Sequence, residues 1–359
     1  MRITYLIFGI FLGCLFTACK PDFELNASYQ DVTVVYGILN HQDSVQYVKI
    51  YKGFQSHQQG GVYIDAQNPD SIHYNVNDIE VVLEEYNKGK FIKQMIMTPT
   101  NEVVKEDGIF YSGDSRILYK TDEKIKKECS YKIVITNKKT GKVTEGNTPI
   151  VGDFSIKSSS QSINMNRNGI LSFTKSPSAS DSCYEFHISF LYFEVDKETH
   201  KVTQGKITKI ISQAGEGYDE DKHDSELFIK PYSATFYDDI ATALKPNPKV
   251  VRYLGKPTLS LAEGYVCIEI EGWAAGSSLK NYIISNKPTS SFVQVNTLFT
   301  NMRVVPKEDG STEGFAFGFF SSKVKCTPRQ YISDHSEDSL VNGSKTRHLG
   351  FRYRKEYNP

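Results

Sequence analysis

The 359-residue sequence lacks the short motifs that mark many enzyme families. It contains no HExxH pair, no glycine-rich phosphate loop and no GxSxG turn, so nothing in it indicates a zinc peptidase, a nucleotide-binding enzyme or an α/β-hydrolase. An excess of either charge is also absent, because the chain has 42 basic and 42 acidic side chains. Nucleic-acid-binding proteins carry a strong basic excess, and we therefore expect no nucleic-acid partner.

Long hydrophobic runs are scarce, and the main one lies at the start of the chain. Residues 3–18 form an apolar stretch of 16 residues, shorter than the about 20 that a helix needs to cross a bilayer. A charged residue before such a stretch and small residues at its end are typical of a secretory signal. An ordinary signal peptide cut near Ala18 explains this pattern. However, Phe16-Thr17-Ala18-Cys19 resembles the bacterial lipobox, which implies a signal peptide over residues 1–18, acylation of Cys19 and a lipidated linker over residues 19–28.

The residues after Cys19 bear on the location of the protein. Lys20, Asp22 and Glu24 follow it and resemble the signal that sends lipoproteins of Bacteroidetes to the outer face of the outer membrane. Two or three acyl chains hold a protein stably, at about 0.8 kcal/mol per buried CH₂. We expect a lipid-anchored protein of the outer membrane, on either its periplasmic or its cell-surface face.

The next part of the chain, residues 29–150, has the period-2 alternation of β-strands. Tyrosine and phenylalanine are abundant, at 22 and 21 residues, and both favour strands. The turn at residues 87–90 predicts a hairpin. Tyr131 stands where sandwich folds place a corner tyrosine. The sequence therefore predicts a mainly β protein with an N-terminal immunoglobulin-like β-sandwich.

A second β-rich domain is predicted over residues 151–326, and it includes two short helices. Ser233 is the expected cap of the first helix, in which Phe236 and Ile240 share one face. Ser277 or Ser278 is the expected cap of the second. The glycines of residues 314–320 are expected at a tight packing point of a closing strand. We expect residues 327–359 to be a loosely held polar tail.

Six cysteines occur, and none belongs to a CxxC pair or a histidine cluster, which argues against a zinc site. An exported protein can form disulfides. Cys183 and Cys267 are the candidate pair, because both fall on the polar side of alternating strands; free cysteines in a sheet are the alternative.

Two further clusters carry weak chemical signals. Gly113-Asp114-Ser115 has the letters of a GDS-type esterase, but it lies between predicted strands and not on a strand-to-helix turn. Asp219, Glu220, Asp221 and Asp224 lie in a predicted acidic loop that could offer oxygens to calcium, but their spacing does not fit an EF-hand. We predict no catalytic residue, no metal site and no cofactor.

With that layout, the chain resembles the DUF4249-type lipoproteins of Bacteroidetes. The resemblance rests on Cys19, on the early strand at residues 33–39, and on Asn301 followed by the glycine-aromatic segment at residues 314–319. It implies association with a TonB-dependent outer-membrane transporter but no active site. We expect a binding or accessory lipoprotein and not an enzyme. A structural or adhesive surface protein is the alternative, and a hydrolase without a recognisable motif is the third hypothesis.

Overall fold

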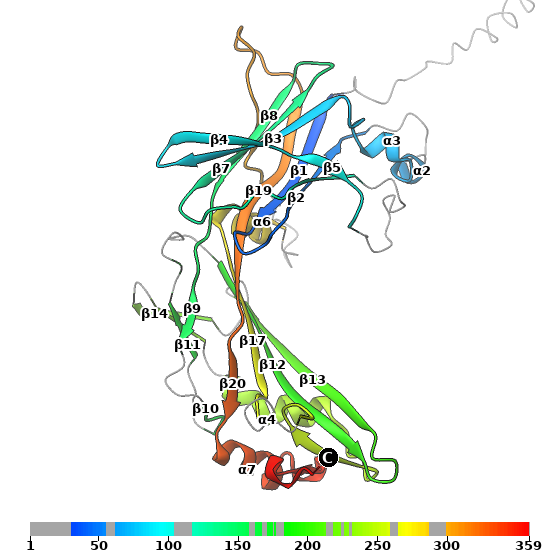
Figure 1. Ribbon diagram of the computed structural model, residues 1–359, viewed down its shortest axis with the longest axis vertical. Coiled ribbons are helices and arrows are strands. Elements are labelled where there is room, and N and C mark those ends of the chain that lie inside the picture. Colours follow the sequence, from blue (N-terminus) through cyan, green and yellow to red (C-terminus); the bar gives the residue numbers. More distant parts are fainter. Residues whose placement is uncertain are drawn as a thin grey trace, which may run out of the picture.

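The computed structural model describes residues 30–54, 62–103, 117–157, 162–166, 171–174, 176, 183–212, 218–223, 226–229, 232–258, 265–286 and 299–358. Within these ranges the protein is mainly β, which confirms the predicted class. The strands build two bodies stacked along the long axis of the molecule (Figure 1).

The upper body in Figure 1 is a sandwich of two sheets. One sheet has the strand order β18-β8-β7-β3-β4, and the other follows β19-β1-β2-β6-β5. The bounds are β1 Val32–Leu39, β2 Gln46–Lys52, β3 Ile79–Asn87, β4 Lys90–Ile96, β5 Thr98–Thr100, β6 Leu118–Thr121, β7 Ser130–Asn137, β8 Val143–Pro149, β18 Met302–Val304 and β19 Phe315–Cys326. Two short helices, α2 (Val62–Ala66) and α3 (Pro69–Ile72), lie beside β2 and β5.

Alternation along the strands fills the space between the two sheets. Val35 and Val48 come from one sheet, and Leu83 and Ile133 come from the other, and all four are fully buried. Tyr131 lies in this core, and its hydroxyl accepts a hydrogen bond from the backbone N–H of residue 126 at 2.9 Å. That contact is the signature of a tyrosine corner, so the prediction for Tyr131 is confirmed.

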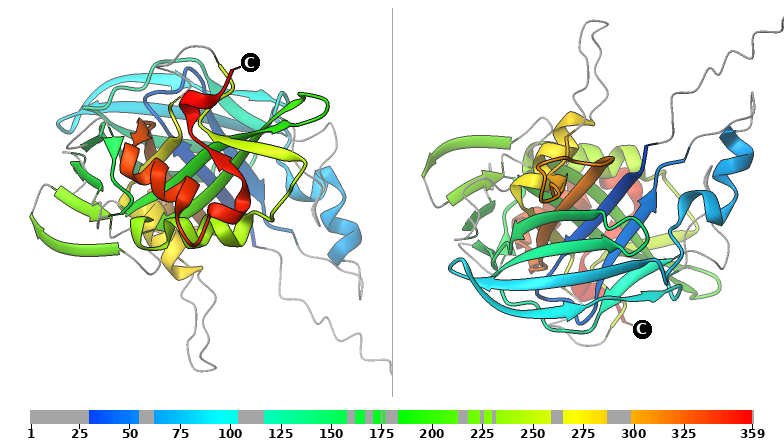
Figure 2. Two further views of the ribbon diagram at one scale, coloured as in Figure 1. Left: turned by 90° about the horizontal axis from the view of Figure 1, so that it is seen from below. Right: turned by 90° about the horizontal axis from the view of Figure 1, so that it is seen from above.

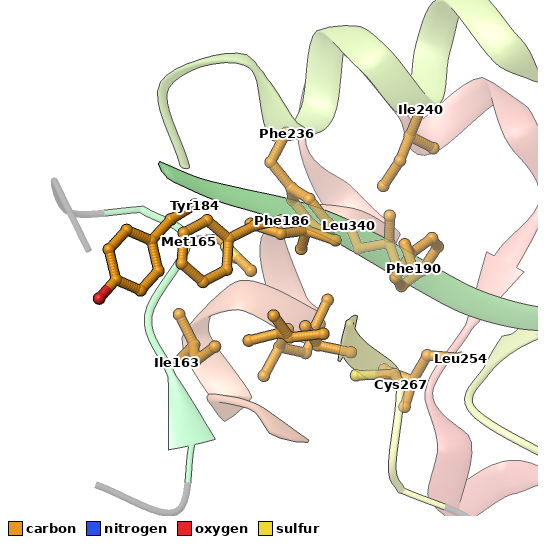
Figure 3. Packing of buried hydrophobic residues seen from close by; sticks show 14 of the residues in the cluster. Ile163, Met165, Tyr184, Phe186, Phe190, Phe236, Ile240, Leu254, Cys267 and Leu340 are labelled. Atoms are coloured by element: carbon orange, nitrogen blue, oxygen red, sulfur yellow. The ribbon is translucent and has the colours of Figure 1, made fainter. Parts of the chain in front are cut away.

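The lower body holds a second core (Figure 3). Phe186 and Phe190 of β12 point into it, and Phe236 and Ile240 of α4 and Leu340 of α7 pack against them. Burying one such phenylalanine stabilises the fold by about 1.5–3 kcal/mol. The elements are β9 Ser155–Lys157, β10 Ser162–Ile163, β11 Leu171–Thr174, β12 Cys183–Asp196, β13 Val202–Ser212, β14 Tyr218–His223, β15 Glu226–Ile229, α4 Tyr232–Ala243, β16 Val250–Leu254, β17 Ile268–Ala275, α6 Ser277–Ser285, β20 Arg329–Ile332, α7 Asp334–Asn342, η2 Arg347–Leu349, β21 Phe351–Arg352 and η3 Arg354–Glu356.

One strand, β19, belongs to both bodies. Its first part pairs in parallel with β1, from Val32 beside Phe315 to Leu39 beside Ser322, and its last four residues pair antiparallel with β17. β18 likewise pairs with β8 of the upper sandwich. The predicted division into residues 29–150 and 151–326 is therefore wrong for β18 and most of β19, because the upper body recruits these late strands.

Two glycines make the β1–β19 pairing possible. Gly314 and Gly318 have φ values of +78° and +91°, and a Cβ on either would lie 2.0 Å from a carbonyl oxygen of the neighbouring chain segment. The predicted tight packing point is confirmed. Asn301 fixes the same strand, because its side chain donates to the carbonyl of Phe320 at 2.7 Å and accepts from the N–H of Phe320 at 2.9 Å.

The C-terminal segment is not a loosely held tail, and that expectation is wrong. Helix α7 lies across the strands of the lower body, as Figure 2 shows from below. Leu340, Leu349 and Phe351 are buried in the second core. Arg354 is also buried, and its guanidinium group donates to the carbonyl of Thr258 at 2.7 Å. The polar composition of this segment conceals a few apolar residues whose spacing lets them pack into the second core.

Three local expectations also need correction. Helix α4 begins at Tyr232, one residue before the expected cap Ser233. Helix α6 is preceded by Gly276 at its N-cap, with no side-chain cap from Ser277 or Ser278. The predicted acidic loop is partly strand β14. None of the helices in the described ranges is both long and apolar enough to cross a membrane.

Candidate functional site

A groove of about 280 Å³ lies where the two bodies meet, and we call it the Trp273 groove. Its walls come from the start of β12, the end of β17, helix α6 and β19. The lining residues are Cys183, Tyr184, Glu185, Trp273, Ala275, Leu279, Lys280, Ile283, Ile284 and Lys323. This volume is close to the lower end of the roughly 300–1,000 Å³ that small-molecule sites occupy.

The register of three strands places Trp273 on the open face of the sheet. Glu185 of β12 and Lys325 of β19 are its cross-strand neighbours. Side chains alternate between the faces of a strand, so the buried Ala274 points toward the second core while Trp273 points away from it. Trp273 is the only tryptophan of the chain, and it is half-buried.

Helix α6 forms the apolar wall of the groove. Its first turn is held by the Ser321 hydroxyl, which accepts a hydrogen bond from the N–H of Leu279 at 3.2 Å. Tyr282 packs against Phe319 with ring centroids 4.4 Å apart. These contacts orient the helix so that Ile283 and Ile284 remain 40% and 51% exposed. Two adjacent exposed isoleucines beside a concave surface mark it as a candidate for contact with an apolar group.

The charges around the groove are mostly positive. The ammonium groups of Lys323 and Lys325 lie 4.6 and 5.0 Å from the centroid of the Trp273 ring, within the range of cation–π attraction. Lys325 also pairs with Glu271 at 3.1 Å. Glu185, the one carboxylate among the described lining residues, lies 2.8 Å from the imidazole Nε2 of His187.

Cys183 sits in the groove as a half-buried thiol. Burial raises its pKa, and the ammonium of Lys280 opposes that shift without cancelling it. The thiol is therefore protonated at neutral pH and is a weak nucleophile.

A second, more open polar cavity of about 960 Å³ lies at the lower rim of the sandwich. In it, the Nε2 of His41 lies 2.8 Å from a carboxylate oxygen of Asp153, and Lys127 lies 2.9 Å from the other oxygen. Hydrogen bonds from Lys127 and His41 outweigh partial burial and lower the pKa of Asp153. The imidazoles of His41 and His187 thus both pair with carboxylates.

The predicted disulfide between Cys183 and Cys267 is wrong, since both are free thiols. Cys183 lies beside Ala275 at the far end of β17, whereas Cys267 precedes the start of that strand and its carbonyl accepts from the N–H of Leu191. Eight strand positions at about 3.3 Å each separate them, far beyond the reach of a disulfide. Cys267 is also fully buried, because the alternation breaks just before β17 begins.

Several sequence predictions fall outside the described residues. These are the signal peptide, the lipidation site Cys19 and linker, and Gly113-Asp114-Ser115. Asp219, Glu220 and Asp221 lie in β14, but Asp224 is outside the description. Over the described portion of the chain, no cluster of three His, Cys, Asp or Glu residues is arranged to hold a metal ion.

The groove itself was not predicted, although one signal for it exists. Trp273 continues the alternation of Glu269 and Glu271, so a large aromatic residue occupies the polar face of its strand. A large aromatic side chain on the polar face of a strand departs from the usual pattern of burial and is therefore informative. Nothing in the sequence indicates that α6 and Lys323 approach the same position.

Comparison with known proteins indicates no function. No family model matches the chain, and no curated protein matches it either. One similar solved structure is the C-terminal globular domain of an oligosaccharyltransferase from Pyrococcus abyssi, with 10% identity and a TM-score of 0.20, covering 58% of this chain and 39% of that one. Two structures of alpha-2-macroglobulin from Escherichia coli are 6% and 8% identical, with TM-scores of 0.17 and 0.19, and cover 85% of this chain but only 16% and 14% of theirs. The chain thus spans well under half of each protein, and the likenesses are too remote to carry an argument.

Proposed function

We propose that this protein is an outer-membrane lipoprotein that acts as a binding module, anchored through acylated Cys19 and holding a ligand in the Trp273 groove. The observation that carries the binding role is the groove itself, where the single tryptophan and two exposed isoleucines line one concave surface. Apolar side chains with a few polar groups at their rim are typical of ligand sites.

The anchor rests on the lipobox-like residues 16–19. A protein held in this way works at a membrane surface, and the resemblance to DUF4249-type lipoproteins suggests an outer-membrane transporter as its partner. Cells fed an alkyne-tagged fatty acid should label the wild-type chain but not the Cys19→Ser variant. A wild-type chain that carries no label and is released into the medium would refute the proposed lipid anchor.

The binding role is tested by isolating the full chain from its own membranes and identifying co-purifying small molecules by mass spectrometry. We expect at least one compound to be enriched with the wild-type chain and depleted with Trp273→Ala. Phe91→Ala is the matched control, because it removes an exposed aromatic ring from β4, outside the groove lining. Equal recovery from all three chains would refute the binding role.

A second candidate, assembly of a structural or adhesive surface layer, is favoured by strand β4. β4 is the edge of its sheet, and Phe91, Ile92 and Ile96 on it are exposed. An exposed apolar edge is a template for strand addition by another chain. Concentration-dependent assembly in analytical ultracentrifugation that Ile92→Lys abolishes would support this function, and a monomer at all concentrations would refute it.

A further inference from the structure

We infer that the ligand class of the Trp273 groove is a small amphipathic anion, with an apolar body and one carboxylate. This inference rests on the proposed binding role and adds the chemistry of the ligand. It follows from three properties of the described lining residues: their excess of positive charge, their apolar wall and their few neutral hydrogen-bonding side chains.

The positive charge comes from Lys280 and Lys323. Across the described ranges, neither ammonium group lies within ion-pair distance of a carboxylate, whereas Lys325 is paired with Glu271. Glu185, the single acid among the described lining residues, is hydrogen-bonded to His187. The described lining thus carries two ammonium groups against one carboxylate, and an anion in the groove would meet an excess of positive charge, which is electrostatic complementarity of the kind that selects ligands by sign.

The same geometry argues against a cationic ligand. A tryptophan face attracts cations, but two lysine ammonium groups already lie within 5.0 Å of the Trp273 ring centroid. A further positive charge at this position would be repelled.

A sugar is also a poor fit, because polyhydroxy ligands need many donors and acceptors. Among the lining residues that the structure describes, none is Asn, Gln, Ser or Thr. The one hydroxyl of this described lining, that of Tyr184, accepts a hydrogen bond from the N–H of Ser176 at 3.0 Å. Leu279, Ile283 and Ile284 can offer only apolar contact, which suits a short alkyl chain or a ring.

The test uses the fluorescence of Trp273, which is free of background from other tryptophans because the chain has one. The full lipidated chain in neutral phosphatidylcholine vesicles is titrated with octanoate, octanol and octylammonium, which share an apolar body and differ in charge. We expect saturable binding of octanoate, binding of octanol weaker by about fivefold or more, and the weakest binding for octylammonium.

Variants then assign the effect to the two lysines. Lys280→Gln with Lys323→Gln should weaken octanoate binding by about fivefold while leaving octanol unchanged, since each partly exposed pair contributes modestly. Lys88→Gln with Lys90→Gln removes the same charge from the exposed β3–β4 turn and should change neither. Alkylation of Cys183 in the wild-type chain gives a second readout that needs no variant: octanoate should slow it, and octanol at equal concentration should slow it less.

Equal binding of octanoate and octanol, or octanoate binding that survives loss of both lysines, would overturn this inference while leaving the proposed binding role intact. Failure of all three probes would also overturn it. The binding role itself fails only if no compound depends on Trp273 in the membrane-derived preparation, so the two failures are distinguishable.

Discussion

Replacing Gly318 by alanine tests the strand pairing on which both bodies depend. Gly318 has a φ of +91°, and an added Cβ would lie 2.0 Å from the carbonyl oxygen of Val35 on β1. An L-residue in this region of φ is strained by about 1–2 kcal/mol. Relieving the contact also requires the two strands to separate by about 1 Å, which weakens two or three ladder hydrogen bonds of about 0.5–1.5 kcal/mol each.

Together these effects predict that Gly318→Ala lowers the free energy of unfolding by about 2–6 kcal/mol. Gly310→Ala is a matched control, since Gly310 has a φ of +81° with nothing within 4 Å of the added Cβ. It should show only the strain of about 1–2 kcal/mol. Urea unfolding followed by far-UV circular dichroism and by Trp273 fluorescence measures both variants. A difference between them of less than about 0.5 kcal/mol, the scatter of surface substitutions, would refute the close approach of β1 and β19.

Three other predictions concern buried side chains. Tyr131→Phe should lower the free energy of unfolding, measured with urea, by about 1–3 kcal/mol. The substitution removes the acceptor for the N–H of Lys126 and a donor to the fully buried Glu85, and an unchanged free energy would contradict the tyrosine corner. Burial opposes the charge of Glu85, but hydrogen bonds from Lys126 and Tyr131 outweigh it and hold its pKa below the ordinary 4.5. A lowered pKa in the folded state stabilises the protein above the unfolded value, so this stability should be lost as the pH falls below 4.5, and acid titration of Glu85→Gln should lack that loss. Intact mass spectrometry after alkylation at pH 8 should show Cys183 modified in the folded chain and Cys267 modified only after unfolding, because burial raises the pKa of Cys267 to about 12; a disulfide between them would contradict the register of β12 and β17.

The sequence predicts local structure well where a strand or helix has one buried face. The hairpin of β3 and β4 follows from its turn, where Lys88 and Gly89 adopt positive φ, and Phe236 and Ile240 are buried in α4 as expected. Alternation identifies which face of a strand is buried, but it does not identify the neighbouring strand. The pairing of β1 with β19 could therefore not be predicted from the sequence.

The candidate site was missed for the same reason. Trp273, Ile283 and Lys323 come from three elements whose approach depends on sheet register and on the seating of α6. Cys267 illustrates a smaller failure, because extending the alternation one residue beyond the start of β17 reverses the face on which a side chain lies. That error could not be detected without knowing where the strand begins.

The shared strand β19 also has a consequence for the order of folding. β1 pairs with β19, and close to this pairing Gln42 and Lys325, which are 283 positions apart, exchange two hydrogen bonds. Of the strands that the structure describes, the first to leave the ribosome therefore waits for one of the last. Contacts of such sequence separation slow folding, and until they form, the apolar edge of β1 is open to association with other chains. Newly made molecules should therefore need a chaperone during this interval.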